Sequence, residues 1–115
     1  MIRTASEMRT QVRENMRGGA GAVTILHCFE KDEFKANSRL CAWLTIPPGA
    51  GIGDHAHERE DEVFIILSGT GIVDDGTTQT RVNAGDAVLT GNGQAHSIHN
   101  DGNDNLEFIA VIMCY

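Results

Sequence analysis

Two histidines in the middle of the chain, His55 and His57, are spaced so that they could bind one ligand together. On a β-strand, residues two apart point to the same face, so both imidazole rings can converge on one ion. After a charged turn, Glu62 opens the next apolar run, and it can face the same interior if the two strands pair. His96 comes much later, so its ring must reach this point from across the fold. Three neutral imidazoles and one carboxylate suit a divalent transition metal.

Glycines and one asparagine frame these groups at fixed intervals. Residues 49–69 and 85–100 resemble the two sequence motifs of the cupin family, and the stretch from residue 49 to residue 100 spans about half of the chain. The one departure is Gly91, where the family motif has proline; this difference reduces turn rigidity but removes no ligand. The positions that fit are Gly49, His55, His57, Glu62 and Gly69 in the first motif and Gly85, Gly93, His96 and Asn100 in the second.

The resemblance implies an all-β fold, the double-stranded β-helix or jelly-roll barrel of cupins, with one metal ion inside. It carries ligand roles onto His55, His57, Glu62 and His96. Asp61 would also meet the family spacing, but Glu62 falls on the strand proper. The ligand set suits Mn, Fe, Co, Ni, Cu or Zn and disfavours Ca and Mg, which prefer oxygen. Such a site leaves coordination positions open, and its affinity should fall at acid pH because imidazole must lose its proton to bind.

The rest of the sequence indicates short strands separated by turns in a single domain, residues 1–115. Residues 1–17 fit either a short helix, with Thr4 and Glu7 at capping-box spacing, or an edge strand. Residues 30–37 should form a loop or one helical turn. Strands are expected at residues 22–29, 39–46, 55–58, 62–67, 71–74, 77–82, 87–90, 96–99 and 106–113.

Strand alternation predicts which side chains line the interior. If Glu62 faces inward, Phe64 does too, and Phe108 lies on one face of the last strand. Arg39 and Trp43 share a face of strand 39–46 that could line a pocket. In that case Arg39 could clamp a carboxylate beside the metal, although we favour the alternative in which it reaches solvent from the strand start. The candidates for substrate binding are Arg39, Trp43, Phe64, Gln94 and Phe108.

No residue is an unambiguous second catalytic group. The carboxylates of the turn after His57 are expected to be solvated, because carboxylates are rarely buried; they are Glu58, Glu60 and Asp61. His99 has the opposite strand parity to His96 and should lie outside the ligand set, and His27 is interpreted as structural. The candidates for a second catalytic role are Glu60, His99, Tyr115 and Gln94.

Composition excludes several classes of partner. The formal net charge is −7 and the nine Lys and Arg residues are scattered, which disfavours nucleic acid and anionic membrane surfaces. Cys28, Cys41 and Cys114 lie far apart in apolar runs, which indicates reduced, buried thiols and neither a disulfide framework nor a zinc site. No signal-peptide pattern and no apolar run of membrane-spanning length occurs, so the cytoplasm is the expected location.

The open metal site favours an enzyme that acts on a small polar or carboxylate-bearing molecule. Small cupins that the chain resembles include oxidases, dioxygenases, decarboxylases, isomerases and lyases, and the fold does not choose among them. The alternative is a non-catalytic cupin that binds or senses a small molecule or metal. A structural role of the seed-storage kind is disfavoured because the ligand set is complete. The resemblance also implies a homodimer, paired through edge strands.

Overall fold

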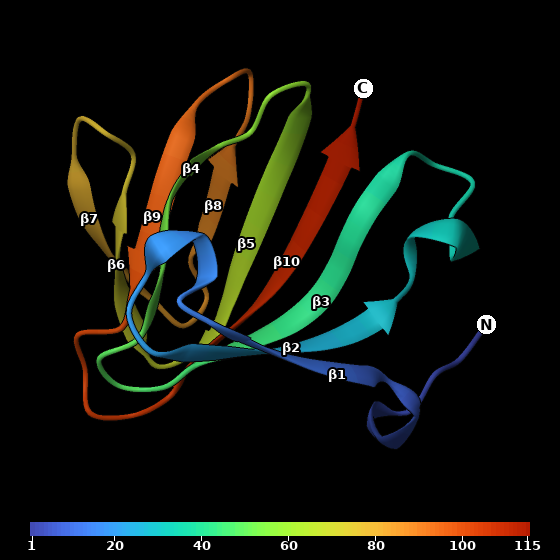
Figure 1. Cartoon of the computed structure of the whole chain (residues 1–115), viewed down its shortest axis with the longest axis horizontal. Helices are drawn as coiled ribbons and strands as arrows, with labels where there is room; N and C mark the ends of the chain where they lie inside the picture. Colours follow the sequence, from blue (N-terminus) through green and yellow to red (C-terminus); the bar gives the residue numbers. More distant parts are fainter.

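Ten antiparallel strands form two facing sheets in the computed structural model, which describes all residues 1–115 (Figure 1). The larger sheet has the order β1-β2-β3-β10-β5-β8 and the smaller one β4-β9-β6-β7. The expected jelly-roll fold class is confirmed by this double-sheet arrangement. The strands are β1 (Arg9–Glu14), β2 (Ala22–Phe29), β3 (Ser38–Ile46), β4 (Gly51–Ala56), β5 (Glu60–Ser68), β6 (Thr70–Asp74), β7 (Gln79–Asn83), β8 (Ala87–Thr90), β9 (Ala95–His99) and β10 (Leu106–Cys114).

The N-terminal segment contains both of the elements that the sequence left open. Thr4 and Glu7 form a capping box around a single 3-10 turn, η1 (Ala5–Glu7), and the chain then continues as the edge strand β1. A second turn, η2 (Met16–Gly18), leads into β2, and residues 30–37 contain a third, η3 (Lys31–Glu33). None of these turns has the length and hydropathy of a helix that crosses a membrane.

The strand expected at residues 55–58 is wrong in its boundaries, because β4 runs from Gly51 to Ala56. The glycines near its start, Gly51 and Gly53, let another segment approach closely. A Cβ atom at Gly53 would collide with the backbone of Arg17, and Gly19 meets the backbone of Gly51 in the same way. These contacts hold η2 against β4, the strand that carries His55.

The core lies between the two sheets and follows the predicted alternation. Phe64 and Phe108 are almost completely buried, and their ring centroids lie 4.6 Å apart. On β3, Leu44 points into the core whereas Trp43 is exposed on the outer face, and Ile65 of β5 is exposed there as well. The inner face of the larger sheet is therefore apolar at its centre, which leaves the polar site to one side of this packing.

The last residue of the second motif, Asn100, joins the loop between β9 and β10 to the end of β3. It is fully buried, and its amide nitrogen donates hydrogen bonds of 2.8 Å to the carbonyls of Ile46 and Asp104. Its side-chain oxygen accepts a bond from the backbone of Gly102. Gly91, where the family motif has proline, packs so closely on Asp61 that any Cβ atom there would collide with the carboxylate.

Candidate metal centre

Four side chains converge at one end of the space between the sheets. The possible ligand atoms of His55, His57, Glu62 and His96 all lie within 4.8 Å of one another. His57 Nε2 and His96 Nε2 are 3.0 Å apart, and Glu62 Oε1 lies 2.9 Å from each of them. His55 and His57 come from β4 and the turn after it, Glu62 from β5 and His96 from β9. The two sheets must pack together to form the cluster.

The chemistry of the cluster fits a metal ion. Glu62 Oε1 is buried and accepts a hydrogen bond from no group of the protein, although two imidazoles lie against it. Two ligands that meet at about 90°, each about 2.1 Å from an ion, are about 3 Å apart, which matches these spacings. A divalent ion would satisfy the orphaned oxygen and the facing nitrogen lone pairs together. The residues present therefore fit a transition-metal site.

The outer nitrogen of each ring has its own partner, which leaves Nε2 free to bind. His55 Nδ1 donates to the carbonyl of Gly53 at 2.7 Å, and His57 Nδ1 donates to Glu60 at 2.8 Å. His96 Nδ1 lies 2.8 Å from the hydroxyl of Thr90. Such partners fix the tautomer and the orientation of ligand histidines. Burial also lowers the pKa of His55, which favours its neutral, metal-binding form.

Glu60 lies in the interior, and the expectation that it would be solvated is wrong. It opens β5 with only 9 % of its surface exposed, because its two oxygens are satisfied from two sides. Arg39 donates two bonds of 2.6 Å to it, and His57 donates the third contact. The hydrogen bonds from the Arg39 guanidinium, joined by that of His57, lower the pKa of Glu60 to about 2. Arg39 thus keeps Glu60 ionised, and the ionised Glu60 orients His57 by accepting its Nδ1 hydrogen.

Arg39 reaches this position because β3 is irregular at that point. Consecutive residues of β10, Ile112 and Met113, pair with Leu40 and Ser38, so Arg39 is the extra residue of a β-bulge. Both Arg39 and Leu40 line the cavity, which alternation along a regular strand would forbid. The position beside the histidine cluster, which was the less favoured alternative in the sequence analysis, is thus the one that Arg39 occupies.

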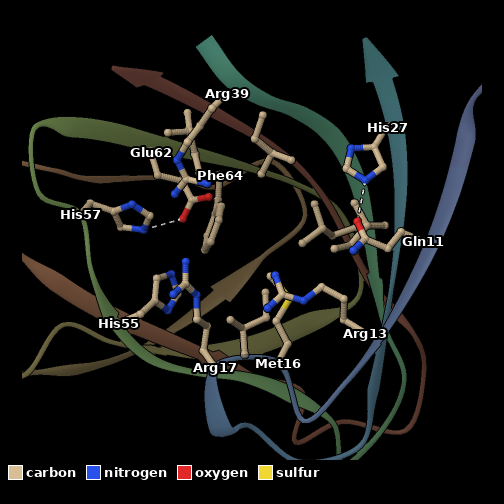
Figure 2. Close-up of a pocket in the computed structure, with 15 residues that line it drawn as sticks. Gln11, Arg13, Met16, Arg17, His27, Arg39, His55, His57, Glu62 and Phe64 are labelled. Carbon is tan, nitrogen blue, oxygen red and sulfur yellow. Dashed lines mark hydrogen bonds and ion pairs between the residues drawn. The ribbon is translucent and has the colours of Figure 1, made fainter. Parts of the chain in front are cut away.

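A cavity of about 200 Å³ opens beside the cluster (Figure 2). At about 30 Å³ per water molecule, it has room for about six or seven waters, or for a molecule with roughly that many heavy atoms. Phe64 forms part of its wall and stacks on the ring of His96 at 5.0 Å. The lining residues are Gln11, Arg13, Met16, Arg17, Ile25, His27, Arg39, Leu40, Leu44, Ile52, His55, His57, Glu62, Phe64 and Ile112.

The remaining candidates from the sequence lie away from this cavity. Trp43 is on the outer face of the sheet, and Phe108 packs in the core. The backbone carbonyl of Gln94 accepts the amide hydrogen of His57, but its side chain does not line the cavity. His99 is exposed on β9, and the hydroxyl of Tyr115 donates to Asp61 at an exposed position.

The structure adds three polar lining residues that the sequence analysis did not single out, Gln11, Arg13 and Arg17, and places His27 in the lining as well. His27 is bonded to Gln11 through its Nε2 at 2.9 Å, so its interpretation as a structural histidine agrees with its contact. The only sequence signal that could have identified these lining residues was the edge-strand alternative for residues 1–17, which puts Gln11 and Arg13 on one face of a strand. The cysteines are free thiols, but they are half-buried where burial was expected.

Comparison with known proteins gives the family. Residues 42–112 match the family model described as the Cupin domain. A protein of Thermotoga maritima called oxalate-binding protein is 41 % identical over 113 residues, which cover 98 % of this chain and 93 % of that protein. The chain belongs to the cupin family.

Solved structures agree with this assignment. A crystal structure from Thermotoga maritima, described as a predicted oxalate decarboxylase, superposes with a TM-score of 0.95 at 40 % identity, over the full length of both chains. The polyketide cyclase RemF from Streptomyces resistomycificus shares the fold, with a TM-score of 0.79 at 18 % identity over 100 % of this chain and 80 % of its own.

The ligand assignment predicts that His57→Ala abolishes metal binding. The variant removes one nitrogen donor from the centre of the cluster, so we expect metal affinity to fall by at least about 100-fold. Metal analysis of protein purified without added ions measures this loss. His99→Ala, which removes an exposed imidazole outside the cluster, is the control and should retain metal. Equal metal content in the parent and His57→Ala proteins would contradict the assignment.

The contacts of Glu60 predict that its substitution weakens metal binding, although less than the loss of His57 does. Glu60→Gln removes the charge that pairs with Arg39 and orients His57, so metal affinity should fall by about 10- to 100-fold. Competition with a chromophoric chelator gives the affinity. Glu58→Gln makes the same chemical change at an exposed position two residues earlier and should have no effect. Unchanged affinity in Glu60→Gln would show that the carboxylate does not support the site.

Proposed function

We propose that the protein binds a small carboxylate of the oxalate class through a divalent transition metal held by His55, His57, Glu62 and His96. The observation that carries the proposal is the orphaned Glu62 oxygen, which faces two imidazole nitrogens beside a small cavity. The relative called oxalate-binding protein, which matches nearly the whole chain, supports the choice of ligand class. A metal ion bound there would polarise a carboxylate and stabilise negative charge.

The sequence favoured an enzyme over a binding module, and the residues that line the cavity restrict the kind of reaction such an enzyme could catalyse. Proton-shuttling decarboxylation needs a second acid or base near the substrate. Glu62 is the only carboxylate among the lining residues, and Glu60 lies behind His57, bonded to Arg39. If the bound acid reacts, we expect oxygen-dependent chemistry centred on the metal. The alternative is binding without turnover. We also infer a cytoplasmic location from the three free thiols.

The proposal predicts that oxalate binding depends on the metal. Titration calorimetry should show one site per chain in Mn-loaded protein, and an affinity at least about 100-fold lower after chelation. The His57→Ala protein, treated in the same way, is the control for metal that binds elsewhere. Oxygen uptake and carbon dioxide release by the same samples separate an enzyme from a binding module. Equal oxalate affinity with and without metal would refute the proposed function.

We propose further that two copies of the chain pair through the outer face of the larger sheet. Trp43, Ile109 and Ile65 lie side by side in register across three neighbouring strands, followed by Val63 and Leu89 in the next row. Trp43, Ile65 and Leu89 are exposed. A contiguous apolar face of this kind marks an interaction site. The homodimer expected from the sequence would use this face in preference to the edge strands.

If two chains pair through the outer face of the larger sheet, a charge placed on that face should separate them. Ile65→Glu places a charge at the centre of the apolar row and should convert a dimer into monomers, as measured by light scattering after gel filtration. Val12→Glu is the matched control, because Val12 is also exposed but lies on the edge strand β1. A dimer that is lost in Val12→Glu and kept in Ile65→Glu would show that edge strands form the contact.

A further inference from the structure

Two arginines that line the cavity, Arg13 and Arg17, have no partner in the protein. Neither forms an ion pair or a side-chain hydrogen bond, although both could reach water or a ligand. Four other arginines each contact a carboxylate: Arg3, Arg9, Arg39 and Arg81. Acidic side chains are plentiful in a chain of net charge −7, yet three arginines contact no carboxylate. Two of these three, Arg13 and Arg17, line the same cavity, and the third, Arg59, lies outside it.

The fold directs both side chains into the cavity. On β1, Arg13 pairs in register with Val23 of β2, and Val23 is fully buried on the inner face. Arg13 therefore shares this inner face, whereas its neighbour Val12 is exposed. Arg17 lies in η2 with a φ of 55°, a conformation that few side chains adopt. Figure 2 shows both side chains running into the cavity, toward the side where His55 and His57 lie.

Arg17 and the metal site share one structural support. The backbone of Arg17 packs directly on Gly53, where no side chain would fit. The carbonyl of Gly53 in turn accepts the hydrogen bond from His55 Nδ1. The same stretch of β4 thus fixes the position of η2 and the orientation of a ligand histidine. The backbone of Arg17 is consequently fixed relative to the cluster, and its exposed side chain extends from that point along the cavity.

The charges in the cavity favour a dianion over a monoanion. Three neutral imidazoles and the Glu62 carboxylate leave a divalent ion with one net positive charge. Arg39 is neutralised by Glu60, but Arg13 and Arg17 each add an uncompensated positive charge. A ligand with a single negative charge would leave most of this excess in place. Guanidinium groups also match carboxylate geometry through paired hydrogen bonds.

We propose that Arg13 and Arg17 are specificity-determining residues that bind the second carboxylate of a small dicarboxylate and so select dianions. This inference rests on the proposed function, because it requires that the ligand also contact the metal. It adds that the N-terminal segment, which lies before the residues that match the family model, determines which acids are accepted.

The test compares two ligands of nearly equal shape, oxalate and oxamate, which differ in one carboxylate and hence in charge. Calorimetry on Mn-loaded protein gives the affinity of each for the parent and for Arg13→Gln and Arg17→Gln. Each substitution should weaken oxalate by about tenfold and oxamate by no more than about threefold, since one charge-assisted contact is lost. Arg17→Lys, which keeps the charge but loses the planar group, should weaken oxalate less than Arg17→Gln.

The control variant is Arg59→Gln, which removes the same charge from an unpaired arginine outside the cavity lining and should leave both affinities unchanged. Metal content and melting temperature are measured for every variant, so that a loss of metal or of folding is recognised. If folded, metal-loaded Arg13→Gln and Arg17→Gln keep the parent ratio of oxalate to oxamate affinity, the inference is wrong and the proposed function stands. If the metal-loaded parent binds neither ligand, the proposed function fails and the inference fails with it.

Discussion

The site depends on one constraint: Glu62 Oε1 and the Nε2 atoms of two histidines are buried close together, and their lone pairs face one another. Burying a carboxylate oxygen against two imidazole nitrogens without hydrogen bonds is unfavourable unless a cation fills the gap. The protein holds these atoms close because partners outside the cluster fix each ring: a backbone carbonyl for His55, a carboxylate for His57 and a hydroxyl for His96. The arrangement is therefore pre-formed, and binding an ion would relieve repulsion that folding has created.

The clustering of His55, His57, Glu62 and His96 and the fold class were both accessible from the sequence, because they follow from local rules. Spacing of two along a strand brings His55 and His57 to one side, and the glycine positions of the two motifs fix the turns around them. The same alternation placed Phe64 inside and its neighbour Ile65 outside. Even the boundaries of β2 and β8 coincide with the expected ranges.

The groups that surround the ligands could not be found in this way. Glu60 is a carboxylate in a highly charged turn, and only the approach of Arg39 from another strand explains its burial. Arg39 itself is positioned by a bulge, which breaks the alternation on which the expectation was based. For Arg13 and Arg17, the choice between helix and edge strand had to be settled first, and that choice depends on pairing with β2. Long-range pairing, which the local pattern does not encode, therefore determines the surroundings of the four-residue cluster.

The bulge at Arg39 divides β3 into two segments of opposite phase. Beyond it, Leu40, Ala42 and Leu44 keep the regular inward set, while the extra residue lets one cationic side chain join them on the cavity side. The apolar interior is thus preserved without excluding a charge from the same strand. It follows that the length of this segment is as constrained as its composition: removing one residue here would restore a regular ladder and leave Glu60 without its counter-ion.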